Sequence, residues 1–380
     1  MRSSNTVPVG MAKLRRPGHG YEDVPGRLRF TMQEMGARAV HLVGSYPAES
    51  TEEAMLAVLD GAGSRLLTLP TGETSRYEFY IQPIIEGLAA QGVLEVKRAG
   101  SWESSRERTV YQVPRGTELT GDAMELGYRA EAQEALPIYR RLRAERDLTG
   151  LPLQIGMPTD FTLAFIAMGI AGIRSHRAAF RDAAARDIAA IRESAGEEVI
   201  VQLEATAEMV LTAKAAPLHK GLDSVLGIGK GIAAAAEAAP AGTRFGVHLC
   251  VGSMNNRSRV TLRDARPLVE LANSVARRWP SDRPLEYIHG PFAAGDVPPS
   301  TDPRFYAPLA ELDLPSGTRF IAGFVHESPS LEEQSTTLRM IEQALGRRLD
   351  GIASACGLGR RPRAIADAMV ARAAALADVT

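Results

Sequence analysis

The chain has 380 residues, 45% hydrophobic and 23% charged, which is enough to bury the core of one large domain. Its 44 basic and 45 acidic residues are interspersed and leave a formal net charge of -1, which argues against nucleic acid or an anionic membrane as a partner. No apolar run reaches the roughly 20 residues that cross a bilayer. The basic segment 1–16 also lacks the apolar core of a secretory signal. We therefore expect a cytoplasmic protein that binds small molecules; its oligomeric state stays open.

The first 24 residues are rich in Pro, Gly and Arg and show no apolar periodicity. We expect residues 1–24 to form an N-terminal arm outside the fold. The remaining residues, 25–380, are expected to form a single catalytic domain.

Short runs rich in Val, Ile and Leu alternate with segments of helical period along this domain, a pattern typical of repeated βα units. The predicted strands are Ala39–Ser45, Leu66–Pro70, Leu153–Met157, Val199–Glu204, Phe245–Cys250, Leu285–His289, Arg319–His326 and Gly351–Cys356. The clearest predicted helices are Thr51–Gly61, Ala178–Ser194, Thr261–Arg278, Leu331–Leu345 and Arg363–Ala377. Eight such units favour a closed α/β barrel, the (β/α)8 TIM barrel, although an open doubly wound sheet has the same local pattern.

A long segment, Val93–Asp147, separates the second predicted strand from the third. Within it, Val93–Arg98 and Thr109–Val113 are predicted to pair as a hairpin, and a helix follows them. Such a hairpin-helix insertion would lie over one rim of the barrel. A second long loop, Gly290–Pro303, is a candidate substrate loop.

Barrel enzymes carry their chemistry at the C-terminal ends of the strands. Three side chains able to bind metal fall there. His248 and Cys250 are two residues apart on one strand and therefore point to the same side, and Cys356 ends the last strand. One imidazole and two thiolates suit Zn2+. The alternative is that the two cysteines of the chain are ordinary buried residues.

Six short motifs follow one another in the chain from residue 43 to residue 358. They are Val43-Gly44-Ser45-Tyr46-Pro47, Gly72-Glu73-x-x-Arg76, Gly156-x-Pro158-Thr159, Gln202-Leu203-Glu204, His248-x-Cys250 and Cys356-Gly357-Leu358. In this order they resemble the C-terminal catalytic barrel of the cobalamin-independent methionine synthase family, as found in single-barrel relatives of the superfamily shared with uroporphyrinogen decarboxylase-like proteins. The resemblance covers roughly residues 39 to 376.

The resemblance implies a zinc ion held by the His and Cys of the H-x-C motif, the Cys of the C-G-L segment, and a Glu on the strand between them. This chain has His289 at the position of that Glu. Glu286 falls on the opposite side of the same strand and cannot take its place. We therefore expect His289 to be the fourth ligand, unless it only binds substrate.

The resemblance also implies a pocket for an amino acid or a thiol. In it, Gly44 and Ser45 would offer backbone groups, and Glu73 and Glu204 would hold a substrate ammonium group. The matched motifs add Arg76 and Thr159 as substrate-binding residues, while Glu73 and Arg76 could instead form an ion pair. His326 would be a catalytic proton donor or a buried core histidine.

These residues favour a zinc-dependent methyl- or alkyltransferase that activates a small-molecule thiol toward a methyl or alkyl donor. Two other functions stay open. One is a zinc-dependent lyase or hydrolase with Glu204 or His326 as its base. The other is a non-catalytic binding protein on the same barrel.

Overall fold

The structure is a computed structural model that describes residues 38–379, except residues 76–78, 80 and 104–106. The described residues belong to one compact unit, Ala37–Thr380. The expected arm, residues 1–24, and Arg76 lie outside the described residues, so both remain predictions.

The centre of this unit is one sheet of eight parallel strands in the order β1-β10-β9-β8-β7-β6-β5-β2. Its strands are β1 (Ala39–His41), β2 (Leu69–Pro70), β5 (Leu153–Pro158), β6 (Val199–Ala205), β7 (Arg244–Leu249), β8 (Leu285–Pro291), β9 (Arg319–Val325) and β10 (Gly351–Ser354). A parallel bridge between Val40 and Leu66 joins the two ends of this order. The predicted α/β barrel is confirmed, and each expected strand is present.

The strands form where the chain is apolar on both sides of the backbone. All seven residues of β6 are buried, as expected for a parallel strand with the barrel interior on one side and helices on the other. β1 and β2 are shorter than the predicted strands, because residues 42–45 and 66–68 lie outside the regular ladder.

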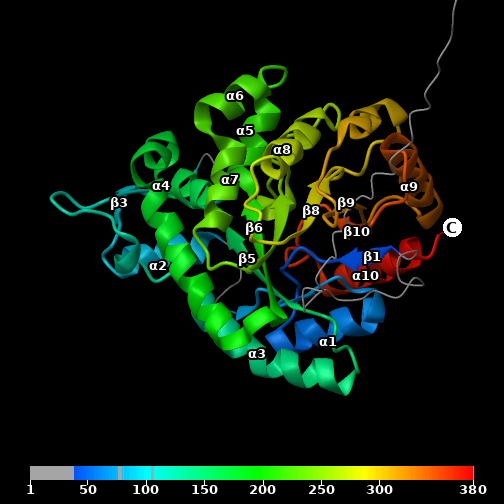
Figure 1. Ribbon diagram of the computed structural model, residues 1–380, viewed down its shortest axis with the longest axis horizontal. Coiled ribbons are helices and arrows are strands. Elements are labelled where there is room, and N and C mark those ends of the chain that lie inside the picture. The colour runs from blue at the N-terminus through cyan, green and yellow to red at the C-terminus, as the bar shows by residue number, and fades with distance from the viewer. Residues whose placement is uncertain (1–37, 76–78, 80, 104–106, 380) are drawn as a thin grey trace, which may run out of the picture. The chain divides into compact units, whose positions relative to one another are not determined.

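Helices surround the strands, as Figure 1 shows. They are α1 (Thr51–Ala62), α2 (Ile81–Ala90), α3 (Tyr128–Glu145), α4 (Asp160–Ala195), α5 (Thr206–Lys214), α6 (His219–Leu226), α7 (Ile228–Glu237), α8 (Arg266–Ala276), α9 (Leu331–Leu345) and α10 (Arg363–Ala377). The side chain of Ser330 caps α9, and Glu333 returns the bond to the Ser330 backbone. α4 begins well before its predicted start and kinks at Gly169, whose φ is 73°.

The predicted hairpin is confirmed as the pair β3 (Glu95–Arg98) and β4 (Val110–Gln112), in which Val96 lies opposite Tyr111. It lies at the left of Figure 1, beside α2. The helix predicted after it is α3.

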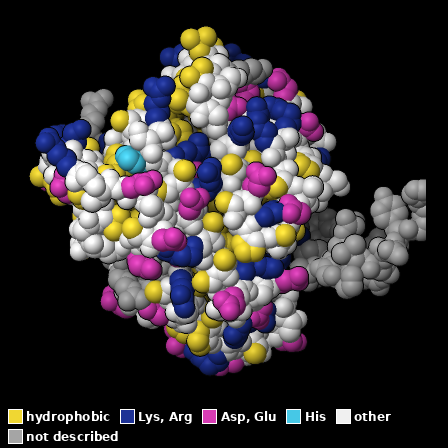
Figure 2. All heavy atoms as spheres, turned by 60° about the vertical axis from the view of Figure 1, so that its left-hand side comes forward, with side chains coloured by type: hydrophobic (Ala, Val, Ile, Leu, Met, Phe, Trp, Pro, Cys, Tyr) yellow, Lys and Arg dark blue, Asp and Glu magenta, His cyan; other side chains and the backbone are white. Residues whose placement is uncertain are grey.

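No helix of the described part of the chain is long and apolar enough to span a bilayer. Basic and acidic side chains alternate over the face in Figure 2 without a large region of one sign.

Candidate metal centre

Three strands place their polar side chains at one level near their C-terminal ends. Glu204 on β6 lies in register with His248 on β7, and His248 lies in register with His289 on β8. Residues in register on parallel neighbours point to the same side of a sheet. Cys250 follows β7 and Cys356 follows β10, so the fold brings both cysteines to this end of the barrel.

The ligand atoms of His248, Cys250 and Cys356 lie within 4.8 Å of one another. The two sulfur atoms are 3.7 Å apart, and neither cysteine forms a disulfide. Two thiolates bound at about 2.3 Å to one tetrahedral Zn2+ lie roughly 3.8 Å apart. The spacing of the sulfur atoms therefore fits a shared zinc ion without rearrangement.

The tautomer of His248 follows from its contact with His289. Nε2 of His289 lies 3.0 Å from the carbonyl oxygen of Ser354, which can only accept, so this nitrogen carries the proton. Nδ1 of His289 then accepts a hydrogen bond from Nδ1 of His248, at 2.6 Å. Nε2 of His248 is thus left with its lone pair, and this buried atom has no hydrogen-bond partner among the described residues. An orphaned imidazole nitrogen beside two sulfur atoms fits a metal ligand.

The same contacts bear on the role expected for His289. Both of its ring nitrogens have partners, and among the described residues the group of potential ligands consists of His248, Cys250 and Cys356. Burial lowers the pKa of His289 well below its usual value, and the neighbouring His248 and His41 add to this effect. His289 therefore lies beside His248 with both ring nitrogens engaged, an arrangement that favours orienting His248 over a place in the ligand set.

A glycine leaves room for the ring of His289. A Cβ atom added at Gly323 on β9 would lie 2.5 Å from Nε2 of His289 and 3.0 Å from the carbonyl oxygen of Ser354. Any larger residue would break the contact that fixes the tautomer.

Polar groups surround the two sulfur atoms. The backbone N–H of Gly252 donates to Cys250 Sγ at 3.3 Å, and Ser253 Oγ lies 3.0 Å from Cys356 Sγ. A hydrogen bond from Cys250 holds the pKa of the Cys356 thiol well below its usual range, and His248 lowers it further. Arg360 donates to Ser253 Oγ at 3.1 Å, which places a positive charge near the sulfur pair. This environment favours thiolate at Cys356.

A cavity of about 460 Å³ adjoins the loop that carries Cys356. Ser45, Glu73 and Arg360 are among the residues that line it, whereas the three ligands are not. The backbone carbonyl of Ser45 accepts from Leu358 N at 2.8 Å, and its hydroxyl accepts from Gly359 N at 3.3 Å. Ser45 thereby holds the Cys356 loop against the cavity.

Glu73 and Glu204 converge beside this cavity. A Cβ atom added at Gly44 would lie 2.1 Å from Oε1 of Glu73, and one added at Gly156 would lie 2.7 Å from Oε1 of Glu204 and 3.3 Å from Oε1 of Glu73. Gln202 donates to Glu204 at 3.0 Å. Burial raises the pKa of Glu73 well above its usual value, and the charge of Glu204 adds to this effect.

Two residues predicted from the sequence have other partners. Thr159 caps α4 by accepting from the backbone N–H of Thr162, and its hydroxyl donates to Glu208. Nδ1 of His326 accepts from the backbone N–H of Ser328 at 3.1 Å. His326 Nε2 is buried without a partner in the described part of the chain, and burial lowers the pKa of His326. Neither residue has a hydrogen bond to the three ligands.

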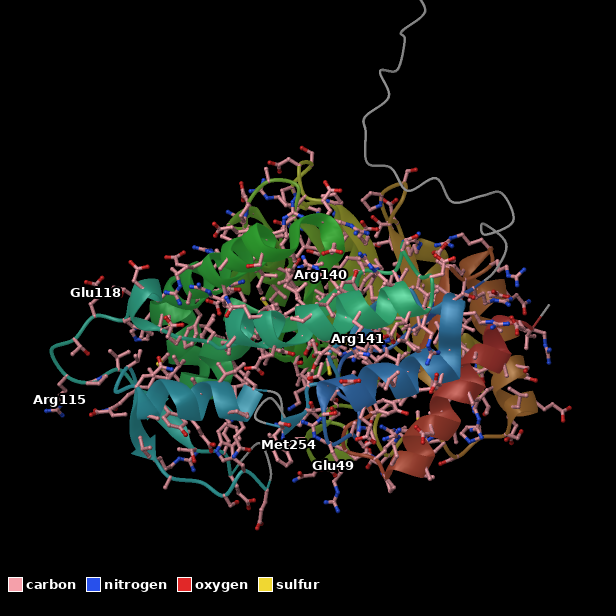
Figure 3. The ribbon with its side chains drawn as sticks, turned by 90° about the horizontal axis from the view of Figure 1, so that it is seen from below. Glu49, Arg115, Glu118, Arg140, Arg141 and Met254 are labelled. Atoms are coloured by element: carbon pink, nitrogen blue, oxygen red, sulfur yellow. The ribbon has the colours of Figure 1, made fainter. Side chains whose placement is uncertain are left out.

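Ser253 and Arg360 contact the cysteine site, yet neither was predicted from the sequence. Arg360 stands four residues after Cys356, and Ser253 stands three residues after Cys250. Their short distance in the sequence from Cys356 and Cys250 is the signal that could have indicated them. Figure 3 labels Met254, the neighbour of Ser253 on the loop after β7, and Glu49, a lining residue of the cavity on the loop after β1.

No established family model matches the sequence, and no curated protein matches it. The fold is similar to that of a B12-independent methionine synthase from Shewanella sp. W3-18-1, whose structure contains selenomethionine. That likeness has a TM-score of 0.58 and 13% identity over 90% of this chain and 97% of the other. A methyltransferase from Methanosarcina mazei is also similar, with a TM-score of 0.51 and 12% identity over 89% of this chain and 93% of the other. At these identities the likeness shows a shared barrel fold.

Proposed function

We propose that this barrel is a zinc-dependent methyl- or alkyltransferase whose acceptor is a small-molecule thiol. The observation that carries the proposal is the group formed by His248, Cys250 and Cys356, in which the imidazole presents an orphaned nitrogen to two sulfur atoms 3.7 Å apart. The shared fold with a methionine synthase and a methyltransferase supports the same chemistry.

Three protein ligands leave one position of a tetrahedral site for an incoming group, as in catalytic rather than structural zinc sites. A bound Zn2+ lowers the pKa of a thiol that coordinates it, so that a nucleophilic sulfur is available at neutral pH.

The residues around the site fix the orientation of the proposed ligand side chains. His289 fixes His248 with Nε2 as the donor atom, and Ser354 in turn fixes His289. Such a contact raises the basicity of a ligating imidazole and sets its ring plane. Arg360 and Ser253 keep the Cys356 side electropositive.

The adjoining 460 Å³ cavity would hold the body of the thiol substrate. Glu73, with Glu204 beside it, would receive an ammonium group, and Gly44 and Ser45 would offer backbone groups to a carboxylate. His326, with its unpartnered Nε2, is retained as a candidate proton donor to the leaving group.

The test combines metal binding with alkyl transfer. We expect one zinc per chain, and X-ray absorption of the zinc-loaded protein should gain a sulfur neighbour when homocysteine or 2-mercaptoethanol is added. Methyl iodide should then methylate the bound thiol faster than the free thiol at pH 7, as measured by NMR of the thioether. Cys356→Ser should abolish this acceleration.

Negative results in this experiment distinguish the two alternative functions. Protein without stoichiometric zinc would favour a binding protein. Zinc that never gains a sulfur neighbour would overturn thiol activation and favour a lyase or hydrolase on the same barrel.

A further inference from the structure

A second cavity, of about 300 Å³, is also lined by Glu73. The N-terminal end of α3, the helix α2 and the end of β5 enclose it. Its lining includes Glu73, Ile84, Leu126, Tyr128, Glu131 and Gly156. Glu73 is therefore shared with the larger cavity beside the metal site.

The second cavity has apolar walls, and the charged side chains that line it are acidic. Pro83, Ile84 and Leu126 supply apolar surface, and Glu73 and Glu131 supply carboxylates. Among the residues that the structure describes, the lining contains no Lys or Arg.

The buried side chain of Tyr128 provides the first evidence for a ligand. Its side chain is only 4% exposed, and its hydroxyl has no hydrogen-bond partner among the described residues. Burial raises the pKa of Tyr128 well above its usual value, and the charges of Glu204 and Glu131 add to this effect. Tyr128 lines the same cavity as Glu131. A buried hydroxyl without a partner carries a free-energy cost. A ligand in the cavity would remove that cost.

Glu131 is held in place beside Tyr128. It is 6% exposed, and Thr71 Oγ1 donates to its Oε1 at 2.6 Å. The space between Glu73 and Glu204 is kept open by Gly156, where a Cβ atom would contact both carboxylates. Arg360 lowers the pKa of Glu73 in part, whereas no cation is among the groups that shift the pKa of Glu131. A buried carboxylate in such a place is unfavourable unless a ligand brings the positive charge.

We propose that this second cavity is a binding subsite for a small organic cation with an apolar body, such as a protonated alkylamine or an onium group. Glu131 and Glu73 pair with the positive charge, the Tyr128 hydroxyl contacts the head group, and Pro83, Ile84 and Leu126 pack against the apolar part. An inorganic cation would leave the apolar walls unused. The subsite does not depend on the metal ligands, because its lining contains none of them.

The probe is butylammonium chloride, titrated into the full-length protein at pH 8 by calorimetry, with 1-butanol as a neutral match of similar shape. We expect butylammonium to bind and butanol to bind at least about tenfold more weakly, as the loss of a charge-assisted contact implies. Glu131→Gln should weaken butylammonium about tenfold, and Tyr128→Phe severalfold. Ile84→Trp, which fills the cavity from α2, should abolish binding.

Glu118→Gln is the matched control. It removes one negative charge from the exposed loop before α3, which Figure 3 shows at the outer edge of the molecule, and it should leave affinity unchanged. Equal binding of butanol and butylammonium would overturn the proposal, as would unchanged affinity in Ile84→Trp. If Glu131→Gln fails to fold, Tyr128→Phe and Ile84→Trp still decide.

The titration is run on both chelator-treated and zinc-loaded protein. Binding in both states with no zinc uptake would sink the proposed metal function alone. Zinc uptake without butylammonium binding would sink the subsite alone.

Discussion

His248 and His289 share a hydrogen bond between their Nδ1 atoms, 2.6 Å apart, although 41 residues separate them in the chain. Because the other nitrogen of His289 donates to a backbone carbonyl, this bond determines which nitrogen of His248 faces the two cysteines. His289, expected from the sequence as a fourth ligand, is placed by this bond to orient His248.

Removing one sulfur should remove the metal. Cys356→Ser is expected to lower zinc content from one per chain to a small fraction, because an alcohol is a far weaker ligand than a thiolate. Elemental analysis after gel filtration measures this, with circular dichroism to check the fold. Ser253→Ala, which changes a contact of Cys356 Sγ without removing a ligand, is the control and should keep full stoichiometry. Full zinc occupancy in Cys356→Ser would show that the site is misassigned.

Changing His289 should alter affinity without altering the ligand set. His289→Ala is expected to weaken zinc about 10- to 100-fold, the usual effect of losing the partner of a ligating imidazole. The d–d spectrum of cobalt-substituted protein should keep its tetrahedral pattern and ligand-to-metal sulfur bands.

Two variants complete the test of His289. His289→Glu puts a carboxylate at this position, and it too should leave the spectrum unchanged if the position stays behind His248. His326→Gln is the control, because none of its hydrogen bonds reaches the three ligands, and zinc affinity should not change. A changed coordination number in His289→Ala would restore this residue as a ligand.

A side chain at Gly323 should also lower zinc affinity, because it would displace the ring of His289. In Gly323→Ala the new methyl group would stand 2.5 Å from His289 Nε2, so the ring must shift and its bond to Ser354 must break. We expect lower zinc affinity together with a lower melting temperature. Gly87→Ala, in a helix where the nearest atom is 3.9 Å away, should leave zinc affinity unchanged. Wild-type zinc affinity in Gly323→Ala would contradict the role given to His289.

Glu131 should make stability depend on pH. Burial raises its pKa from 4.5 to about 7, against the hydrogen bond from Thr71, which lowers it, and with the charges of Glu204 and Glu134, which raise it. The folded protein therefore keeps this proton at pH values where the unfolded chain has lost it. Its favourable contribution is complete below pH 4.5 and is lost as the pH rises toward 7.

Glu131→Gln stays neutral and keeps an oxygen for Thr71. It should therefore be more stable than wild type by roughly 2–3 kcal/mol at pH 8, with little difference at pH 4.5. Urea unfolding at both pH values measures this, and Glu118→Gln should show no such pH dependence. A Glu131→Gln variant that gains no stability between the two pH values would show that Glu131 is ionised in the folded protein.

The sequence alone favoured the barrel and indicated the three candidate metal-binding side chains. Strand and helix periods are local, so the run of apolar segments identified the eight parallel strands, and their ends indicated His248, Cys250 and Cys356. A residue at a strand end is brought to the barrel mouth by topology alone, whatever its neighbours are.

Only the tertiary structure decided what His289, Thr159 and Glu131 do. Whether a histidine binds a metal or orients another histidine depends on which atoms lie within hydrogen-bond distance across neighbouring strands, and here a backbone carbonyl takes one nitrogen of His289. The side chain of Thr159 caps α4. Glu131, on α3 in the insertion, lines the second cavity. These roles rest on contacts between segments far apart in the chain, which periodicity and spacing do not specify.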